Sequence, residues 1–200
     1  MSKQCTKLRE VGYCIAVPLP QQYDHQLRTD RDIRNALDTH PTVVINAHVT
    51  KVSDGDTYHC YHLFEDETEG KLKIRVLGID TPERKNNQWD GQPLAEEATT
   101  ALSDMIYQKD VVLEVLGLDK YRRLLGLTYF EDENGLWRCV GLEMLKLGMA
   151  TVYRSDKKEG TGMECLLDMF EEEARSKGLG VWGREDYEAP REYRARMRRK

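Results

Sequence analysis

The chain has 200 residues, of which 40% are hydrophobic, 8% aromatic and 32% charged, and its formal net charge is −5. This length fits one main domain with extensions, and short periodic apolar runs indicate a folded globular protein rather than a disordered one. No apolar stretch reaches the roughly 20 residues of a membrane-spanning helix, and the apolar residues 12–17 are too few for a secretory signal. We therefore expect a cytoplasmic protein without a membrane partner.

The charge is distributed unevenly. Residues 191–200 contain six cations and one anion, so this tail carries +5 and the rest of the chain −10. The net negative charge of the rest of the chain does not attract a polyanion. Any nucleic-acid contact is therefore expected to be local or assisted by the tail. The tail itself has three interpretations: a solvated helix end, a nucleic-acid anchor, or a patch that directs the protein to the nucleus.

Cysteine and histidine give no strong signal for a disulfide framework or a metal site. The five cysteines are odd in number and lack C-x-x-C spacing, which favours free thiols in a reducing compartment. His59, Cys60 and His62 alternate along an extended segment, so only two of them share a face. A closed structural zinc site needs about four ligands, and ordinary strand packing is therefore preferred here.

The expected elements follow from hydrophobic periodicity and from turn residues. A short helix near Ile33 and Leu37 ends an N-terminal extension, and a β-rich region begins after Pro41. A later helix carries Phe170 and Ala174 on its apolar face and is closed by Gly178. Between them we expect strands at 42–52, 56–64, 73–79, 111–116 and 124–130, turns at 65–70 and 133–135, and helices at 93–108 and 140–147.

Five strands interrupted by one helix and followed by two more predict an α+β fold. The expected architecture is a five-stranded antiparallel β-barrel of the oligonucleotide/oligosaccharide-binding (OB) type, capped by about three helices. The predicted organisation is an N-terminal extension at 1–41, one domain at 42–184, and the basic tail at 185–200. We expect a monomer.

Three short segments place carboxylates and cations at strand ends and turns. Singly, each has an ordinary explanation as a plain turn, a helix N-cap or a solvated loop. The first runs from Ser53 to Thr57 (SDGDT), the second from Arg75 to Glu83 (RVLGIDTPE), and the third from Asp119 to Arg123 (DKYRR).

Together, in this order, the three segments resemble the staphylococcal nuclease-like (thermonuclease) family. Its signatures are an Asp-Gly-Asp-Thr turn, an arginine followed by Asp-Thr-Pro-Glu, and an Asp-Lys-Tyr-Gly-Arg loop. The similarity covers about residues 42–183 and includes a closing Gly-Leu-Gly-Val-Trp. Several motifs in the right order are far more specific than any one of them.

The resemblance implies a role for each matching residue. Asp56, Asp80 and the backbone carbonyl of Thr81 would hold one Ca²⁺, which takes about 6 to 8 oxygen ligands, so water and substrate oxygens complete its shell. Arg75 and Arg123 would bind the scissile phosphate, because a guanidinium is permanently charged and forks onto two oxygens. Glu83 is implied as the general base. Contacts to a neighbouring phosphate are implied for Lys120 and Tyr121, with Arg122 as an added cation.

The implied activity is hydrolysis of DNA or RNA. A calcium-dependent endonuclease of this type breaks the bond from phosphorus to O5′ and leaves 3′-phosphate ends. The alternative is a catalytically weak or inactive domain that binds nucleic acid or protein, because one fold serves many functions. A scaffold that uses its N-terminal extension and tail to bind a partner protein is a third hypothesis.

Two departures from the family pattern affect the expected site. Arg122 stands where the family has a glycine, so a positive φ there would strain the backbone and affect the aim of Arg123. The two tyrosines that stack on a base in the best-known family member fall near Arg154 and Asp156, with only Tyr153 close by. Base stacking is therefore in question.

Overall fold

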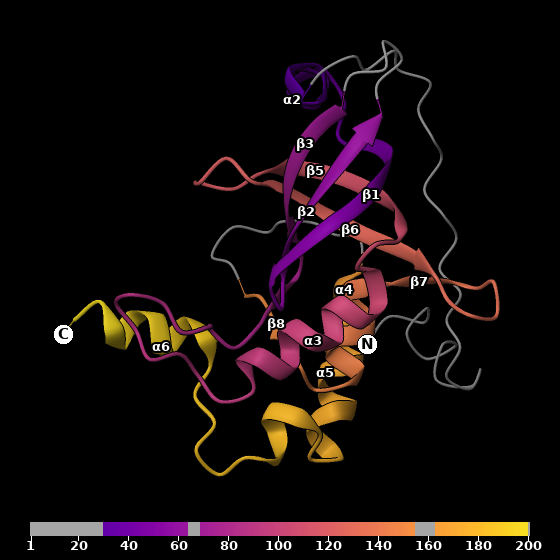
Figure 1. Ribbon diagram of the computed structural model, residues 1–200. Coiled ribbons are helices and arrows are strands. Elements are labelled where there is room, and N and C mark those ends of the chain that lie inside the picture. Colours follow the sequence, from indigo (N-terminus) through magenta and orange to yellow (C-terminus); the bar gives the residue numbers. More distant parts are fainter. Residues whose placement is uncertain (1–29, 64–68, 155–162, 200) are drawn as a thin grey trace.

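The computed structural model describes residues 30–63, 69–154 and 163–199, and it has a closed β-barrel at its centre (Figure 1). Residues 65–68 of the turn expected at 65–70 lie outside the described residues, as does most of the expected N-terminal extension, whereas Glu69 and Gly70 already belong to a strand. The barrel strands are β1 (Val43–Asp54), β2 (Thr57–Leu63), β3 (Glu69–Val76), β5 (Asp110–Leu118) and β6 (Leu124–Glu131).

The sheet has the order β3-β2-β1-β5-β6-β7, where β7 is Trp137–Cys139, and a further pairing of β3 with β6 closes it into a barrel. All neighbours in that order are antiparallel, whereas β3 and β6 are parallel, with Arg75 opposite Leu125. This arrangement confirms the predicted OB-like α+β fold and adds one parallel pair at its closure. The closure matters for the site because it brings the end of β3 beside the start of β6.

The third strand ends earlier than the sequence pattern predicts. We expected it to continue to Ile79, but β3 stops at Val76, and Gly78 then turns the chain with φ of 84°. The residues that follow form β4 (Ile79–Asp80), which pairs with β8 (Thr151–Val152) in a separate two-stranded sheet. A left-handed turn of this kind suits glycine, which has no Cβ to clash. The turn brings Asp80 out of the barrel wall.

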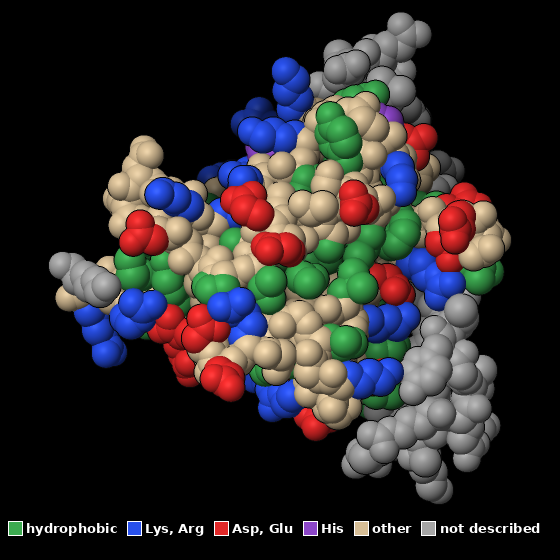
Figure 2. All heavy atoms as spheres, turned by 60° about the horizontal axis from the view of Figure 1, so that its bottom comes forward, with side chains coloured by type: hydrophobic (Ala, Val, Ile, Leu, Met, Phe, Trp, Pro, Cys, Tyr) green, Lys and Arg blue, Asp and Glu red, His purple; other side chains and the backbone are tan. Residues whose placement is uncertain are grey.

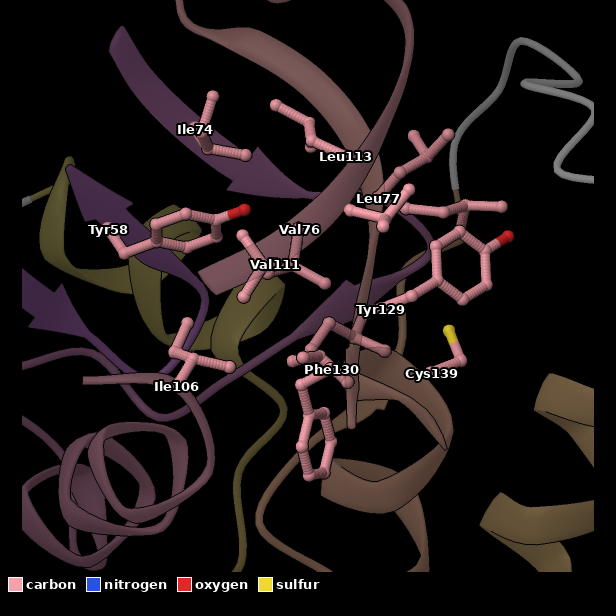
Figure 3. Close-up of a cluster of buried hydrophobic side chains, with 14 of the residues drawn as sticks. Tyr58, Ile74, Val76, Leu77, Ile106, Val111, Leu113, Tyr129, Phe130 and Cys139 are labelled. Carbon is pink, nitrogen blue, oxygen red and sulfur yellow. The ribbon is translucent and has the colours of Figure 1, made fainter. Parts of the chain in front are cut away.

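Three helices cover one end of the barrel, as the sequence predicts. Figure 1 shows α3 (Ala95–Ile106), α4 (Val140–Lys146) and α5 (Glu164–Ser176) together on this side. The short 3₁₀ helix η1 (Gly180–Gly183) follows α5. Buried aliphatic and aromatic side chains from the strands and helices make one continuous core, and Figure 3 shows part of it around Tyr58, Val76 and Ile106. The buried hydroxyl of Tyr58 is paired with Thr128 Oγ1 at 2.9 Å, as a buried polar group requires.

Two helices extend the barrel domain at the two ends of the described chain. Helix α2 (Asp30–Thr39) confirms the predicted short helix and buries Ile33, in contact with β1, β3 and β5. Helix α6 (Pro190–Met197) begins with a proline, which suits a first helical turn, and it buries Tyr193. No helix within the described residues is long and apolar enough to cross a membrane.

The cysteines differ in part from expectation. Cys60 and Cys139 are free and buried, and burial raises the pKa of the Cys60 thiol to about 12 and that of Cys139 to about 11. Cys165 is disulfide-bonded, so the expectation of a free thiol is wrong at this residue. Cys5 and Cys14 lie outside the described residues.

Candidate active site

The β1–β2 turn and the segment after β3 hold two carboxylates next to each other. Asp56 and Asp80 are buried, and the guanidinium of Arg75 bridges them, with Nη1 at 2.9 Å from Asp56 Oδ2 and Nη2 at 3.0 Å from Asp80 Oδ1. The Thr81 hydroxyl donates to Asp56 Oδ2 at 3.2 Å. Residues from two separate segments are thus joined at one point, because each buried carboxylate needs a cation or donor partner.

Gly55 lets these two segments approach. A Cβ at this position would lie 2.9 Å from the Cβ of Ala98 and 2.9 Å from the Oγ1 of Thr81, closer than real side chains come. The glycine of the Asp-Gly-Asp-Thr turn is therefore needed for space, and its neighbour Asp56 reaches Thr81 as a result.

A third carboxylate lies beside the first two. Asp54 Oδ1 accepts the backbone N–H of Asp56 at 3.1 Å. Burial, and then the neighbouring charge of Asp56, raise the pKa of Asp54 to about 7. Asp54 therefore carries a proton over much of the acidic range, which limits the negative charge in this turn.

The loop between β5 and β6 brings Arg123 to the same place. Its Nη1 donates to Thr57 Oγ1 at 3.0 Å, and the Thr57 hydroxyl donates to Asp56 Oδ1 at 2.9 Å. Asp119 Oδ2 accepts a hydrogen bond from Arg123 Nε at 2.6 Å, and this bond fixes the orientation of the guanidinium. Arg123 is thus connected to Asp56 through one hydroxyl.

Arg122 has φ of 63°, so the position where the family has glycine is in the left-handed region. This conformation is unfavourable for a residue with a Cβ. Two hydrogen bonds hold it: the Arg122 N–H donates to the Asp119 carbonyl at 2.9 Å, and Arg34 of α2 donates to the Arg122 carbonyl at 3.1 Å. The expected strain is therefore present, yet Arg123 still reaches Thr57.

The residues expected to contact a neighbouring phosphate lie on the outside of this loop. Lys120, Tyr121 and Arg122 are exposed, and Lys120 Nζ is 4.9 Å from the centre of the Tyr121 ring. Arg123 lies over the same ring at 5.7 Å. Tyr153 is also exposed and faces Arg75 at 6.0 Å, whereas Arg154 is engaged by Asp168 and Glu171, and Asp156 is outside the described residues.

Glu83 lies on the loop between β4 and α3. Its backbone N–H donates to Gln92 Oε1 at 3.0 Å and its carbonyl accepts the Gln92 N–H at 2.8 Å. Its carboxylate Oε1 accepts Nη1 of Arg194 at 2.5 Å, and the same guanidinium takes both oxygens of Asp80, at 3.0 and 2.7 Å. One hydrogen-bonded network thus joins Glu83, Asp80, Asp56 and the two predicted arginines.

Sequence reasoning missed three members of this network. Thr57 and Asp119 stand within the motifs but received no role, although the i, i+4 spacing of Asp119 and Arg123 was a usable signal. Arg194 is one of several arginines in the tail, and nothing in its local sequence distinguishes it from its neighbours. Its position depends on where α6 packs.

The donor chemistry of the site suits a hard cation. Among the described residues no group of three or more His, Cys, Asp or Glu side chains is arranged to hold a metal ion. The expected set contains only two such carboxylates, Asp56 and Asp80, with a backbone carbonyl. Asp56 and Asp80 are each paired with a guanidinium group here, and their oxygens are the kind of donor that Ca²⁺ or Mg²⁺ prefers.

Comparison with known proteins agrees with this geometry. Residues 73–184 match the family model described as staphylococcal nuclease homologue. "Endonuclease Htp3" of Saprolegnia parasitica is 30% identical over 199 residues, which cover 93% of this chain and 92% of that protein. "Probable endonuclease LCL3" of Komagataella phaffii is 32% identical, covering 75% and 74%. An "uncharacterized endonuclease" of Haemophilus influenzae is 32% identical, covering 73% and 71%. The chain therefore belongs to the staphylococcal nuclease homologue family.

Proposed function

We propose that this protein is a calcium-dependent endonuclease that hydrolyses phosphodiester bonds of DNA or RNA, breaks the bond from phosphorus to O5′ and leaves 3′-phosphate ends. Family membership and three relatives named as endonucleases support nuclease activity. The observation that carries the proposal is the single network that joins two buried carboxylates, two arginines and Glu83.

Asp56, Asp80 and the Thr81 backbone carbonyl would hold the cation. When bound, Ca²⁺ would supply positive charge that stabilises the developing charge on the phosphate. Three protein ligands are few for this ion, so the protein alone would bind it weakly and the substrate would tighten the binding. Asp54, whose pKa is raised to about 7, is about half ionised at neutral pH and mostly protonated below it.

Arg75 and Arg123 would stabilise the phosphate as it gains charge. Each is fixed before substrate arrives, Arg75 by two carboxylates and Arg123 by Asp119 and Thr57. Donors held in place need no reorganisation during the reaction, which is where most of their benefit comes from. Loss of one such donor costs roughly a hundredfold in rate.

Glu83 would take a proton from the attacking water. Gln92 binds both the backbone N–H and the backbone carbonyl of Glu83, and these two hydrogen bonds fix the backbone from which the Glu83 side chain extends. A general base has to be ionised and within hydrogen-bond reach of the water it activates. Lys120, Tyr121 and Arg122, exposed beside Arg123, would bind the phosphate next along the strand.

The test is degradation of single-stranded DNA, duplex DNA and RNA by the purified full chain with Ca²⁺, with Mg²⁺ and with a chelator. Arg123→Ala and Glu83→Gln are compared with two matched controls on the surface, Arg184→Ala and Glu133→Gln. We expect cleavage that requires Ca²⁺, falls about a hundredfold in the two site variants and is unchanged in the controls. End-labelled products should carry 3′-phosphates.

Intact nucleic-acid binding without cleavage by the unaltered chain, under every metal condition, would instead support the noncatalytic binding module. Equal rates for Arg123→Ala and Arg184→Ala would remove the assigned role of Arg123. The circular dichroism of each variant shows whether it is folded.

A further inference from the structure

Arg194 reaches the candidate active site from a helix far away in the sequence. It lies on α6, 114 residues after Asp80 and 111 after Glu83, and it binds both carboxylates at once. Its side chain is 22% exposed, and that of Asp80 is 5% exposed. This contact is therefore a partly buried, charge-assisted pair rather than a surface ion pair.

Helix α6 is packed against the loop that carries Glu83. The buried Tyr193 accepts the backbone N–H of Gly91 at its hydroxyl, at 3.0 Å, and meets the ring of Trp89 edge to face at 6.1 Å. Gln92, which binds the backbone of Glu83, also donates to the carbonyl of Glu188 just before the helix, at 2.8 Å. Figure 1 shows α6 beside this loop, away from α3, α4 and α5. Gln92 therefore holds both the segment just before α6 and the backbone of Glu83, the proposed general base.

The position of Arg194 conflicts with the chemistry proposed for the site. Asp80 Oδ2 faces Arg194, and Oδ1 is shared by Arg194 and Arg75, so both oxygens of this cation ligand are occupied by guanidinium groups. A divalent cation bound to the same carboxylate would be repelled by the charge of Arg194. Glu83 Oε1 already accepts a hydrogen bond from that guanidinium, so this oxygen is engaged by Arg194 and not by a water molecule.

Arg194 cannot leave the site by losing its proton. A guanidinium group keeps its proton in proteins throughout the physiological pH range. The Arg194 side chain therefore leaves the site as a cation. It does so either by changing its own rotamer or by movement of α6. Figure 2 shows acidic and basic side chains interspersed on one face of the molecule.

We propose that α6 is an autoinhibitory latch, in which Arg194 occupies the position of the catalytic cation at Asp80 and holds the base Glu83. The latched state neither binds Ca²⁺ well nor activates water, and Ca²⁺ together with a polyanionic substrate shifts the population toward the unlatched state. The latch rests on the proposed function for its biological meaning, although the competition for Asp80 is measurable without nucleic acid.

The test compares Ca²⁺ binding to three full-length proteins by calorimetry, with no nucleic acid present: the unaltered chain, Arg194→Gln and Arg198→Gln. The control removes the same charge from an exposed position just after the same helix. We expect Arg194→Gln to bind Ca²⁺ about tenfold more tightly than the other two proteins. Tyr193→Phe, which removes the hydrogen bond to Gly91 and leaves the charge unchanged, should shift the affinity in the same direction.

Hydrogen exchange of residues 190–197 provides a second readout. In the unaltered chain, Ca²⁺ should accelerate exchange in this helix, because the latch opens when the cation binds. In Arg194→Gln the exchange should already be fast without Ca²⁺. At subsaturating Ca²⁺, Arg194→Gln should cleave faster than Arg198→Gln, and at saturating Ca²⁺ the two should converge.

The latch is wrong if Arg194→Gln binds Ca²⁺ no more tightly than Arg198→Gln, if it binds none, or if Ca²⁺ leaves exchange in α6 unchanged. It is also wrong if Arg194→Gln loses cleavage at saturating Ca²⁺, since Arg194 would then belong to the working site. Failure of the proposed function has a different signature: no protein cleaves nucleic acid at any Ca²⁺ concentration, while the binding and exchange results still decide the latch.

Discussion

Asp119 holds Arg123 by both its side chain and its backbone. Oδ2 accepts from the guanidinium Nε at 2.6 Å, and Oδ1 accepts from the backbone N–H at 2.8 Å. The same oxygen also accepts the N–H of Tyr121. One carboxylate therefore sets the shape of the loop and the direction of the arginine.

Asp119→Asn should lower the cleavage rate about tenfold to a hundredfold, because a misdirected guanidinium loses alignment with the phosphate. The structure offers a control in Asp132, which accepts two backbone N–H groups of the turn after β6 and the guanidinium Nε of Arg138. Asp132→Asn should leave the rate unchanged. Steady-state cleavage of both variants checks this, and equal rates would show that Asp119 does not position Arg123 for catalysis.

Asp119 should also make stability depend on pH. Burial raises the pKa of Asp119, but the hydrogen bonds and charge of Arg123 outweigh burial and hold it below its ordinary value of 3.8. A lowered folded-state pKa stabilises the protein above about pH 4, and the contribution fades as pH falls through the folded-state value. In urea unfolding, the unaltered chain should exceed Asp119→Asn by about 1 to 2 kcal/mol at pH 7. A difference that stays constant down to pH 3 would contradict this.

Arg122→Gly should stabilise the protein by about 1 kcal/mol, because it removes the cost of a left-handed conformation for a residue with a Cβ. Lys120→Gly is the control on the same loop, since φ of Lys120 is not positive and glycine there only adds freedom to the unfolded chain. Denaturant midpoints distinguish the two. If Arg122→Gly also weakens substrate binding and makes it less dependent on salt, the exposed cation contributes to phosphate contact.

Gly55→Ala should destabilise the protein by about 1 to 3 kcal/mol, because the new methyl group would overlap Ala98 and Thr81. It should also weaken Ca²⁺ binding, since Thr81 holds Asp56 in place. Gly117→Ala on β5 is the control, as a Cβ there meets nothing within 4 Å. Thermal unfolding and calorimetry measure the two effects, and similar values for both alanine variants would show that Gly55 is not needed for space.

The secondary structure and the motif residues were predictable because they depend on short-range patterns. The alternation of apolar residues gave the barrel strands, and the 3- and 4-residue spacing gave α3 and α5. The family resemblance then named Asp56, Asp80, Arg75, Glu83 and Arg123, which the structure brings together. The end of β3 at Val76 was not predicted, because Ile79 is apolar and only its pairing with β8 shows that it has left the barrel.

The amino-acid sequence by itself, through motifs that resemble the family's, named the residues of the candidate site: Asp56, Asp80, Arg75, Arg123 and Glu83. The tertiary structure decided that a third arginine belongs with them. Arg194 comes to Asp80 because Tyr193 packs on Trp89 and Gly91 and because Gln92 binds the Glu188 carbonyl, and nothing in the run of tail arginines encodes these contacts locally. A contact between residues 114 positions apart depends on how whole elements pack, which short-range patterns do not contain.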